Sequence, residues 1–267
     1  MNCRYFLAVA IMMYLGMRSP LSAQTAEEST VITLSSEDVG PFRPEERPQV
    51  EEVEELIIQQ TNEFRNKHEL RSIKTDERLQ QTALSFAQYM ARTDRYGHQA
   101  DGHSPAERVR AMDYPLCLIA ENIAYYFATQ GFQTDELATK VVDGWINSPP
   151  HRKNMLREHV TEIGVAVAQS KKTGVFYAVQ LFGRPQSESI QFKVRNAIGE
   201  TVSYQLGEQS FNLPPGYTRT HEMCVPKSLS LTSDKHEAKT WQPQSGNQFD
   251  IRRQDSEIVL VRQTRHE

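Results

Sequence analysis

Four side chains in this sequence combine acid–base or metal-binding chemistry with local patterns that would hold them in place: His98, Glu121, His151 and Glu162. A neutral imidazole can accept a proton or bind a metal, and a carboxylate offers two acceptor oxygens for either purpose. The two histidines lie far apart along the chain, outside the spacing of a compact zinc motif. Spacing alone therefore identifies no metal site.

His151 belongs to a stretch that predicts a short helix. Ser148 suits the N-cap, and Pro149 suits the first helical position, where its fixed φ fits and its missing N–H is not needed. His151 then falls in the first turn, where the positive end of the helix dipole opposes protonation. We expect a neutral imidazole there; an ordinary polar first-turn residue is the alternative.

Glu162 stands at the entrance of a predicted strand. After it, the large Ile163, Val165 and Val167 alternate with small residues up to Ala168, which is the period of a strand with one bulky and one flat face. A flat face allows a helix to approach closely, so we expect helices on both sides of this strand. Glu162 is then either a site residue or a solvated strand end.

His98 lies in a loop between predicted helices. Apolar residues recur at helical spacing over 50–70 and 76–95, and Gly97 is placed to end the second helix. Residues 104–107 (Ser-Pro-Ala-Glu) form a capping box that opens another helix. A loop pinned at both ends can carry a site, although a histidine that bonds only at the surface is the alternative.

Glu121 and Asn122 interrupt an apolar run from Leu116 to Tyr126. A buried carboxylate needs partners, because an unpaired buried charge is costly. A cationic histidine or a metal would suit; anchoring by backbone N–H groups is the alternative. Farther on, a helix is expected from about Thr134, and a hairpin returns over 175–182.

The first 23 residues predict that the protein is exported, and the next 26 predict a linker. Residues 1–23 carry Arg4, an apolar run and a small-residue ending, as in a secretory signal peptide. Residues 24–49 are rich in proline and acidic residues and predict a flexible linker. We expect a secreted or periplasmic protein with no membrane span in the mature chain. The formal charge of −4 makes nucleic acid a poor partner.

Cysteine chemistry and the C-terminal third leave questions open. Cys117 and Cys224 would be the cysteines left after cleavage; export permits a disulfide, but the sequence does not decide it. No serine or cysteine has the sequence context of a nucleophile.

Residues 188–267 show short alternating strands, which predict a small all-β module. Aromatic residues there suit either a core or a binding face: Tyr204, Tyr217 and Trp241.

Residues 50–187 resemble the CAP superfamily of cysteine-rich secretory, antigen 5 and pathogenesis-related proteins in its bacterial form. The motifs that carry the resemblance, in family order, are Thr61–Arg65, Gly97-His98, Asp101-Gly102, Ala120–Ile123, Trp145–Asn154, Thr161–Val165 and Val179–Gly183. The resemblance implies an α+β fold, a three-layer α-β-α sandwich, followed here by the β module.

The resemblance also implies an open cleft where two histidines and two acidic residues meet, which in some members takes up zinc or another divalent ion. His98 and Glu121 match the family pattern directly. His151 matches the bacterial S-x-x-H-R-x-N motif, whereas His159 lies where eukaryotic members place their second histidine. Glu162 matches the bacterial T-E-I-G motif. Ala120 replaces the usual glycine, which leaves less room at that loop.

These patterns favour a binding protein whose cleft takes a small or extended ligand, such as a lipid or a cell-envelope component. The cleft residues would be His98, Glu121, Asn122, His151, His159 and Glu162, with a divalent metal such as zinc held by His98 and His151. The alternative is a metal-assisted hydrolase with Glu121 or Glu162 as general base. A third hypothesis is a scaffold that binds a protein partner through the β module.

Overall fold

The computed structural model describes residues 30–231 and 239–263. The predicted signal peptide and the start of the predicted linker lie outside these residues. The described chain divides into two compact units, one ending at Arg184 and one beginning at Pro185. Each unit is described by itself below.

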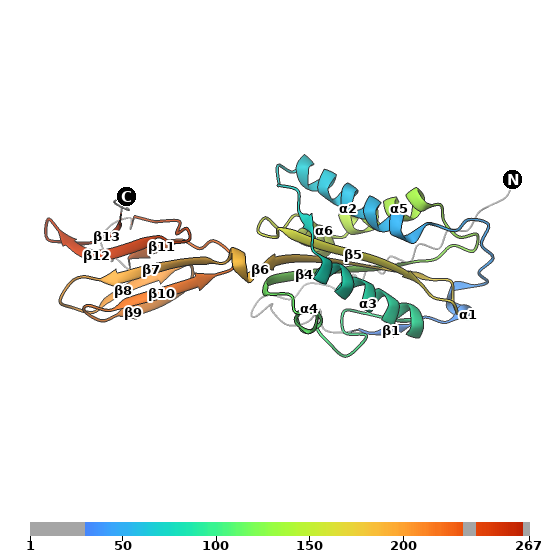
Figure 1. Cartoon of the computed structure of the whole chain (residues 1–267), viewed down its shortest axis with the longest axis horizontal. Coiled ribbons are helices and arrows are strands. Elements are labelled where there is room, and N and C mark those ends of the chain that lie inside the picture. Colours follow the sequence, from blue (N-terminus) through green and yellow to red (C-terminus); the bar gives the residue numbers. More distant parts are fainter. Residues whose placement is uncertain (1–29, 232–238, 264–267) are drawn as a thin grey trace, which may run out of the picture. The chain divides into compact units, whose positions relative to one another are not determined.

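A four-stranded sheet forms the middle of the first unit, in the order β2-β5-β6-β4. Figure 1 labels three of its strands, β4, β5 and β6. The elements are β2 (Lys74–Thr75), β4 (Leu116–Tyr126), β5 (Glu162–Gln169) and β6 (Phe176–Pro185). Strands β5 and β6 form the predicted antiparallel hairpin, with Glu162 opposite Gly183. The short β2 runs parallel to the start of β5.

Helices cover both faces of this sheet, so the first unit is the expected α-β-α sandwich within an α+β protein (Figure 1). One face carries α2 (Val50–Lys67), α5 (Thr134–Asn147) and α6 (Pro149–Met155). The other face carries α3 (Glu77–Thr93) and α4 (Pro105–Ala111).

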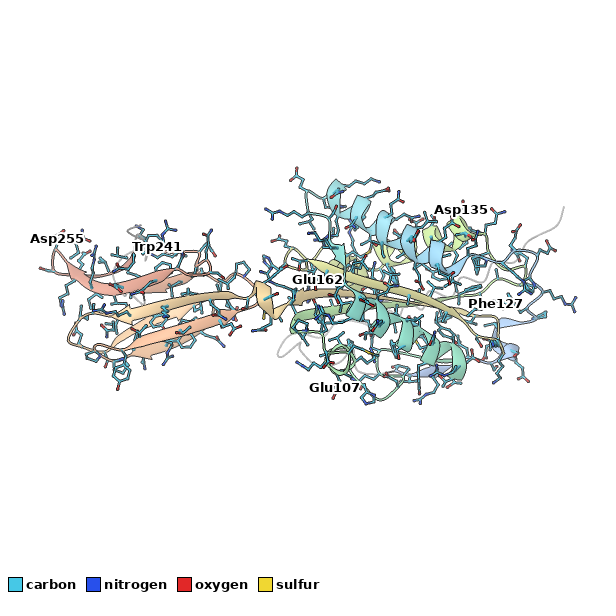
Figure 2. The ribbon with its side chains drawn as sticks, viewed as in Figure 1. Glu107, Phe127, Asp135, Glu162, Trp241 and Asp255 are labelled. Atoms are coloured by element: carbon cyan, nitrogen blue, oxygen red, sulfur yellow. The ribbon has the colours of Figure 1, made fainter. Side chains whose placement is uncertain are left out.

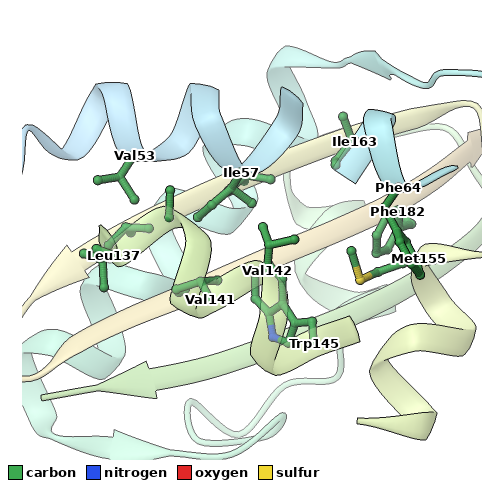
Figure 3. Packing of buried hydrophobic residues seen from close by; sticks show 14 of the residues in the cluster. Val53, Ile57, Phe64, Leu137, Val141, Val142, Trp145, Met155, Ile163 and Phe182 are labelled. Atoms are coloured by element: carbon green, nitrogen blue, oxygen red, sulfur yellow. The ribbon is translucent and has the colours of Figure 1, made fainter. Parts of the chain in front are cut away.

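The alternation along β5 divides the core of this unit into two layers. Its bulky side chains pack against α2 and α5, where they meet a cluster that Figure 3 shows from close by. The helix residues of that cluster include Val53, Ile57, Phe64, Leu137, Val141, Val142 and Trp145. Burying both sides of one strand in this way requires a helix on each face.

The flat side of β5 receives α3 at very short range, as expected. A Cβ added to Gly164 would lie 2.2 Å from the backbone carbonyl carbon of Leu79 in α3. Ala166 is fully buried in the same layer. The backbone of α3 therefore rests on the strand where the strand has no side chain.

Side chains close the edge of β5 where β2 ends. Gln80 of α3 bonds both backbone groups of Val165, accepting from its N–H at 3.0 Å and donating to its carbonyl oxygen. Glu54 of α2 accepts from the Val167 N–H at 2.9 Å. Burial raises the pKa of Glu54 to about 7. Two helices thus supply the hydrogen bonds that another strand would make.

The opposite edge of the sheet, along β4, is closed by side chains too. The indole N–H of Trp145 donates to the carbonyl oxygen of Ile123 at 3.2 Å, and the hydroxyl of Tyr96 donates to the same oxygen at 3.1 Å. Asn154 of α6 donates to the carbonyl oxygen of Glu121 at 3.2 Å. These bonds satisfy backbone groups that no neighbouring strand reaches.

The second predicted helix ends earlier than its glycine suggested. α3 stops at Thr93, and Asp94 takes the left-handed conformation at the C-cap with φ of 52°. The Asp94 carboxylate is buried and accepts from the hydroxyls of Thr173 and Tyr177. Gly97 has another purpose, since a Cβ there would lie 3.0 Å from the carbonyl oxygen of Thr30.

The expectation of a flexible linker is wrong for residues 30–49. Strand β1 (Ile32–Thr33) pairs with β3 (Arg95–Tyr96), and a capped turn of helix, α1 (Ser36–Val39), follows. Leu34 is buried, and the ring of Phe42 packs against Phe127. Isolated apolar residues in a proline-rich segment are enough to dock it, because the domain offers them a surface.

The second unit contains two sheets of short strands, as its sequence predicts. One sheet has the order β10-β7-β12-β13 and the other β11-β8-β9. Their bounds are β7 (Ile190–Asn196), β8 (Val202–Leu206), β9 (Gln209–Leu213), β10 (Thr218–Met223), β11 (Leu229–Leu231), β12 (Gln248–Gln254) and β13 (Glu257–Arg262), after a 3₁₀ turn (Gln186–Glu188).

Aromatic residues of the second unit are used mainly in its core. Tyr204 is fully buried, and the Trp241 ring packs against Phe249 (Figure 2 labels Trp241). Tyr217, in contrast, is 65% exposed. The three aromatic residues therefore do not share one exposed binding face. No helix within the described residues has the length and apolar character to cross a membrane.

Changing Gly164 to alanine should lower the free energy of unfolding of the first unit by about 1 to 3 kcal/mol, because the added methyl group would overlap the α3 backbone. Urea unfolding followed by Trp145 fluorescence would measure this. The control is Gly199→Ala, where a Cβ meets nothing within 4 Å. Equal midpoints for the two variants would contradict the close approach.

Glu54 should make stability depend on pH. Its pKa is raised from 4.5 to about 7 by burial, so the folded state binds this proton more tightly than the unfolded chain. The free energy of unfolding should therefore fall as pH rises from about 4.5 to about 7. Glu54→Gln should remove this fall in unfolding titrations. The control is Glu52→Gln, an exposed carboxylate on the same helix; a similar effect there would refute the assignment.

Candidate functional site

The structure brings together His98 and Glu121, the two residues that match the family pattern most directly. His98 lies in the loop between α3 and α4, and Glu121 lies in the middle of β4. The Nδ1 atom of His98 is 2.8 Å from Oε1 of Glu121. The Glu121 side chain is only 2% exposed, whereas the His98 side chain is 39% exposed. A buried carboxylate thus holds an imidazole at the surface.

Arg108 of α4 completes this arrangement, and the sequence did not single it out. Its Nη2 donates to Oε2 of Glu121 at 2.6 Å, and its Nη1 donates to Oδ1 of Asp101 at 2.9 Å. The buried carboxylate did indicate that a cation was required. The capping box of Ser104 and Glu107 was the other available signal, because it fixes where α4 begins and hence which residues face the sheet.

The partners of Glu121 determine what His98 can offer. A carboxylate bonded to a guanidinium is an ionised acceptor, so the hydrogen of a neutral His98 ring lies on Nδ1 and points at Glu121. Nε2 is then the acceptor. In its neutral form, the His98 ring therefore presents one hydrogen-bond acceptor, Nε2, whose orientation is fixed by the bond to Glu121.

Asn122 follows Glu121 and points to the opposite face of the sheet. It is fully buried, donating to Oε1 of Gln180 at 3.0 Å and to the backbone oxygen of His151 at 3.2 Å. Its Oδ1 accepts from Asn154 at 2.9 Å. Asn122 therefore fixes α6 on the sheet, and its hydrogen bonds go to the protein.

His151 is the third residue of α6, as predicted, and is half-buried. Ser148 is the N-cap residue, as predicted, although its side chain makes no capping hydrogen bond. Pro149 supplies the favourable start instead. The backbone of His151, through its bond to Asn122, joins α6 to β4.

Glu162 and His159 form hydrogen bonds and ion pairs with residues other than His98 and Glu121. The Tyr114 hydroxyl donates to Oε2 of Glu162 at 2.6 Å (Figure 2 labels Glu162). Burial, reinforced by this carboxylate, raises the pKa of Tyr114, so the phenol remains a donor. Nε2 of His159 lies 4.0 Å from Oε2 of Glu158, and the backbone oxygen of His159 accepts from Arg184.

The metal site predicted at His98 and His151 has no third protein ligand among the described residues. Across residues 30–231 and 239–263, no three side chains of His, Cys, Asp or Glu lie close enough together to hold an ion. Both oxygens of Glu121 already accept hydrogen bonds, from His98 and from Arg108. Zinc requires free electron pairs from several protein donors. The donor set here fits a hydrogen-bonded ion pair better than zinc.

Comparison with known proteins agrees with the motifs. The model of the cysteine-rich secretory protein family, CAP, matches residues 58–182. The chain carries a CAP domain. The resemblance in the sequence is thereby confirmed, and His98, Arg108 and Glu121 all lie within the matched part of this CAP domain.

Two bacterial proteins are similar in sequence to part of the chain. The chain is 29% identical over 161 residues to YkwD of Bacillus subtilis and 27% identical over 124 residues to the membrane protein YlbC of the same species, both uncharacterised. These matches take in 60% and 46% of this chain. They cover 54% of YkwD and 34% of YlbC, so neither relative is matched over two thirds of its length.

Two solved structures are similar to part of the chain. An outer surface protein from Borrelia burgdorferi is 22% identical, with a TM-score of 0.44; the match covers 54% of this chain and 99% of that protein. An extracellular protein with an SCP domain from Bacillus anthracis is 26% identical, also with a TM-score of 0.44. That match covers 54% of this chain and 45% of the other.

Asn154→Ala should destabilise the first unit by about 1 to 3 kcal/mol, because it leaves Oδ1 of the buried Asn122 side chain without the donor that Asn154 supplies. Thermal unfolding of the CAP domain would show the loss. Lys153→Ala is the matched control, since Lys153 is the exposed neighbour on α6. If both variants unfold at the same temperature as the parent, the amide pair does not hold α6 in place.

Proposed function

We propose that this is an exported ligand-binding protein whose CAP domain uses His98 to bind a small or extended ligand, such as a lipid or a cell-envelope component. One observation carries the proposal: the His98 ring is 39% exposed while its Nδ1 is held by the buried Glu121. A ring fixed in this way offers Nε2 to a hydroxyl or N–H group of a ligand at little entropic cost.

The surroundings of His98 favour binding over covalent catalysis. Within the described residues, no hydroxyl or thiol side chain is hydrogen-bonded to its ring. Covalent catalysis would need such a nucleophile beside the base. A metal-assisted hydrolase with Glu121 as its general base would need a free carboxylate oxygen, and both oxygens of Glu121 are engaged. The geometry instead suits a ligand that donates a hydrogen bond.

Export is the second part of the proposal. The first 23 residues carry Arg4, an apolar run and the small-residue ending Ser22-Ala23. The matched family is named for its secretory members. A protein that works outside the cytoplasm meets lipids and wall fragments, whose hydroxyl and amide groups can donate to an exposed acceptor.

Changing His98 to alanine should weaken ligand binding by at least about tenfold, the loss expected for one hydrogen bond of about 1.4 kcal/mol. Calorimetric titration of the exported chain with two probes, soluble peptidoglycan fragments and a lysophospholipid below its micelle concentration, would measure it. Whichever probe binds the parent identifies the class of ligand.

The matched control is His103→Ala. His103 lies in the same loop and is exposed, but its Nδ1 faces the backbone oxygen of Asp101 at 3.2 Å where that of His98 faces a buried carboxylate. This variant should bind like the parent. Binding that survives in His98→Ala, or an equal loss in both variants, would refute the assignment of His98. If neither probe binds the parent, the proposed ligand classes are wrong.

A further inference from the structure

Arg108 is a buried cation that contacts two carboxylates and an aromatic ring. Its side chain is 7% exposed, and its two Nη atoms reach the carboxylates of Glu121 and Asp101 at 2.6 and 2.9 Å. The guanidinium stacks over the ring of Phe86, with Cζ 3.6 Å from the ring centroid. Contact with an aromatic face and two carboxylates suits a planar guanidinium and not an ammonium.

Arg108 also binds the loop that carries His98. Nη1 donates to the backbone oxygen of His98 at 3.0 Å and to that of His103 at 2.7 Å. These two carbonyl groups lie on either side of the turn that contains Asp101. One side chain therefore fixes both the loop backbone beneath His98 and the carboxylate that holds the His98 ring.

We infer that Arg108 is the positioning residue of the site: it holds the Glu121 carboxylate and the loop backbone in place, so that His98 turns Nδ1 inward and presents Nε2 outward as an acceptor. The inference rests on the proposed function in one respect only, namely that Nε2 of His98 binds a ligand. The arrangement itself is a property of the protein without ligand, and it can be measured without ligand.

Removing the guanidinium should change the hydrogen-bonding state of His98. Without Arg108, Glu121 would be a buried carboxylate with one partner fewer, and burial favours its protonated form. A protonated Glu121 would donate to Nδ1 and move the ring hydrogen to Nε2. If Glu121 stayed ionised, the imidazole would become its only cationic partner and hold both hydrogens. Either change removes the outward acceptor.

The test is the ring ¹⁵N spectrum of histidine-labelled full-length chain near pH 8.5, where an ordinary histidine is neutral. The two ring nitrogens have distinct shifts in each tautomer and in the imidazolium. The parent should show His98 mainly as the Nδ1–H tautomer. In Arg108→Met the ratio of this form to the others should fall by about tenfold or more, as expected for losing a charge-assisted bond.

Two further variants separate positioning from folding. Arg108→Lys keeps the charge but cannot reach all four acceptors, so it should give a smaller loss of the Nδ1–H form than Arg108→Met. Arg110→Met changes an exposed arginine on the same helix and should leave His98 unchanged. The ring signals of His68, which bonds the Phe64 backbone, report whether the first unit remains folded.

The outcomes are distinct from those of the binding test. An unchanged His98 tautomer in a folded Arg108→Met chain would overturn the role of Arg108, whether or not a probe binds. Loss of the Nδ1–H form in Arg108→Met but not in Arg110→Met supports that role, even if both ligand probes fail. Should Arg108→Met unfold, Arg108→Lys decides: an unchanged tautomer in that variant overturns the inference.

Discussion

A carboxylate inside a sandwich of sheet and helices must be paired, and much of this domain follows from that requirement at Glu121. Burying a single charge costs several kcal/mol unless hydrogen bonds and an opposite charge compensate. The compensation comes from α4, which contributes Arg108, and from the loop before it, which contributes His98. Glu121, Arg108 and His98 therefore connect a strand, a helix and a loop. Among these three side chains, only that of His98 is exposed to solvent to a large extent.

The second constraint is that the strands are covered from both sides. β5 meets it by alternating large and small residues, so that one face fills the layer beneath α2 and α5 and the other lets α3 approach to backbone contact. Side chains alternate along β4 too, so Glu121 and Asn122 point to opposite faces of the sheet. Neighbours in the sequence thus have different tasks: Glu121 holds the exposed His98 ring, and Asn122 anchors α6.

Local patterns in the sequence predict much of this fold, because period and capping are local properties. The helices around residues 50–70 and 76–95, the capping box at Ser104 and the hairpin through Gly174 all appear in the structure. The motifs also predict correctly that His98 and Glu121 meet. The sequence does not predict the role of Arg108, because an arginine on a short helix is usually exposed. Only the tertiary fold shows that this one is buried.

Other features depend on contacts between distant segments, and the sequence could not reveal them. The docking of residues 30–49 depends on Leu34 and Phe42 finding surfaces formed by residues far along the chain. The partners of Glu162 and His151 likewise depend on how Tyr114 and Asn122 are placed. A list of matching motif positions names the candidate residues, but it does not say which of them touch.

The side chains along the two margins of the central sheet have a consequence for how copies of this protein behave toward one another. A bare strand margin is a template on which another chain can add a strand, and such growth leads to aggregates. Here Gln80 and Glu54 occupy backbone groups of β5, while Trp145, Tyr96 and Asn154 occupy those of β4. At these positions, an incoming strand would have to displace several packed side chains before it formed its first bond. The CAP domain is thereby protected from growing sideways into larger sheets when many copies are close together.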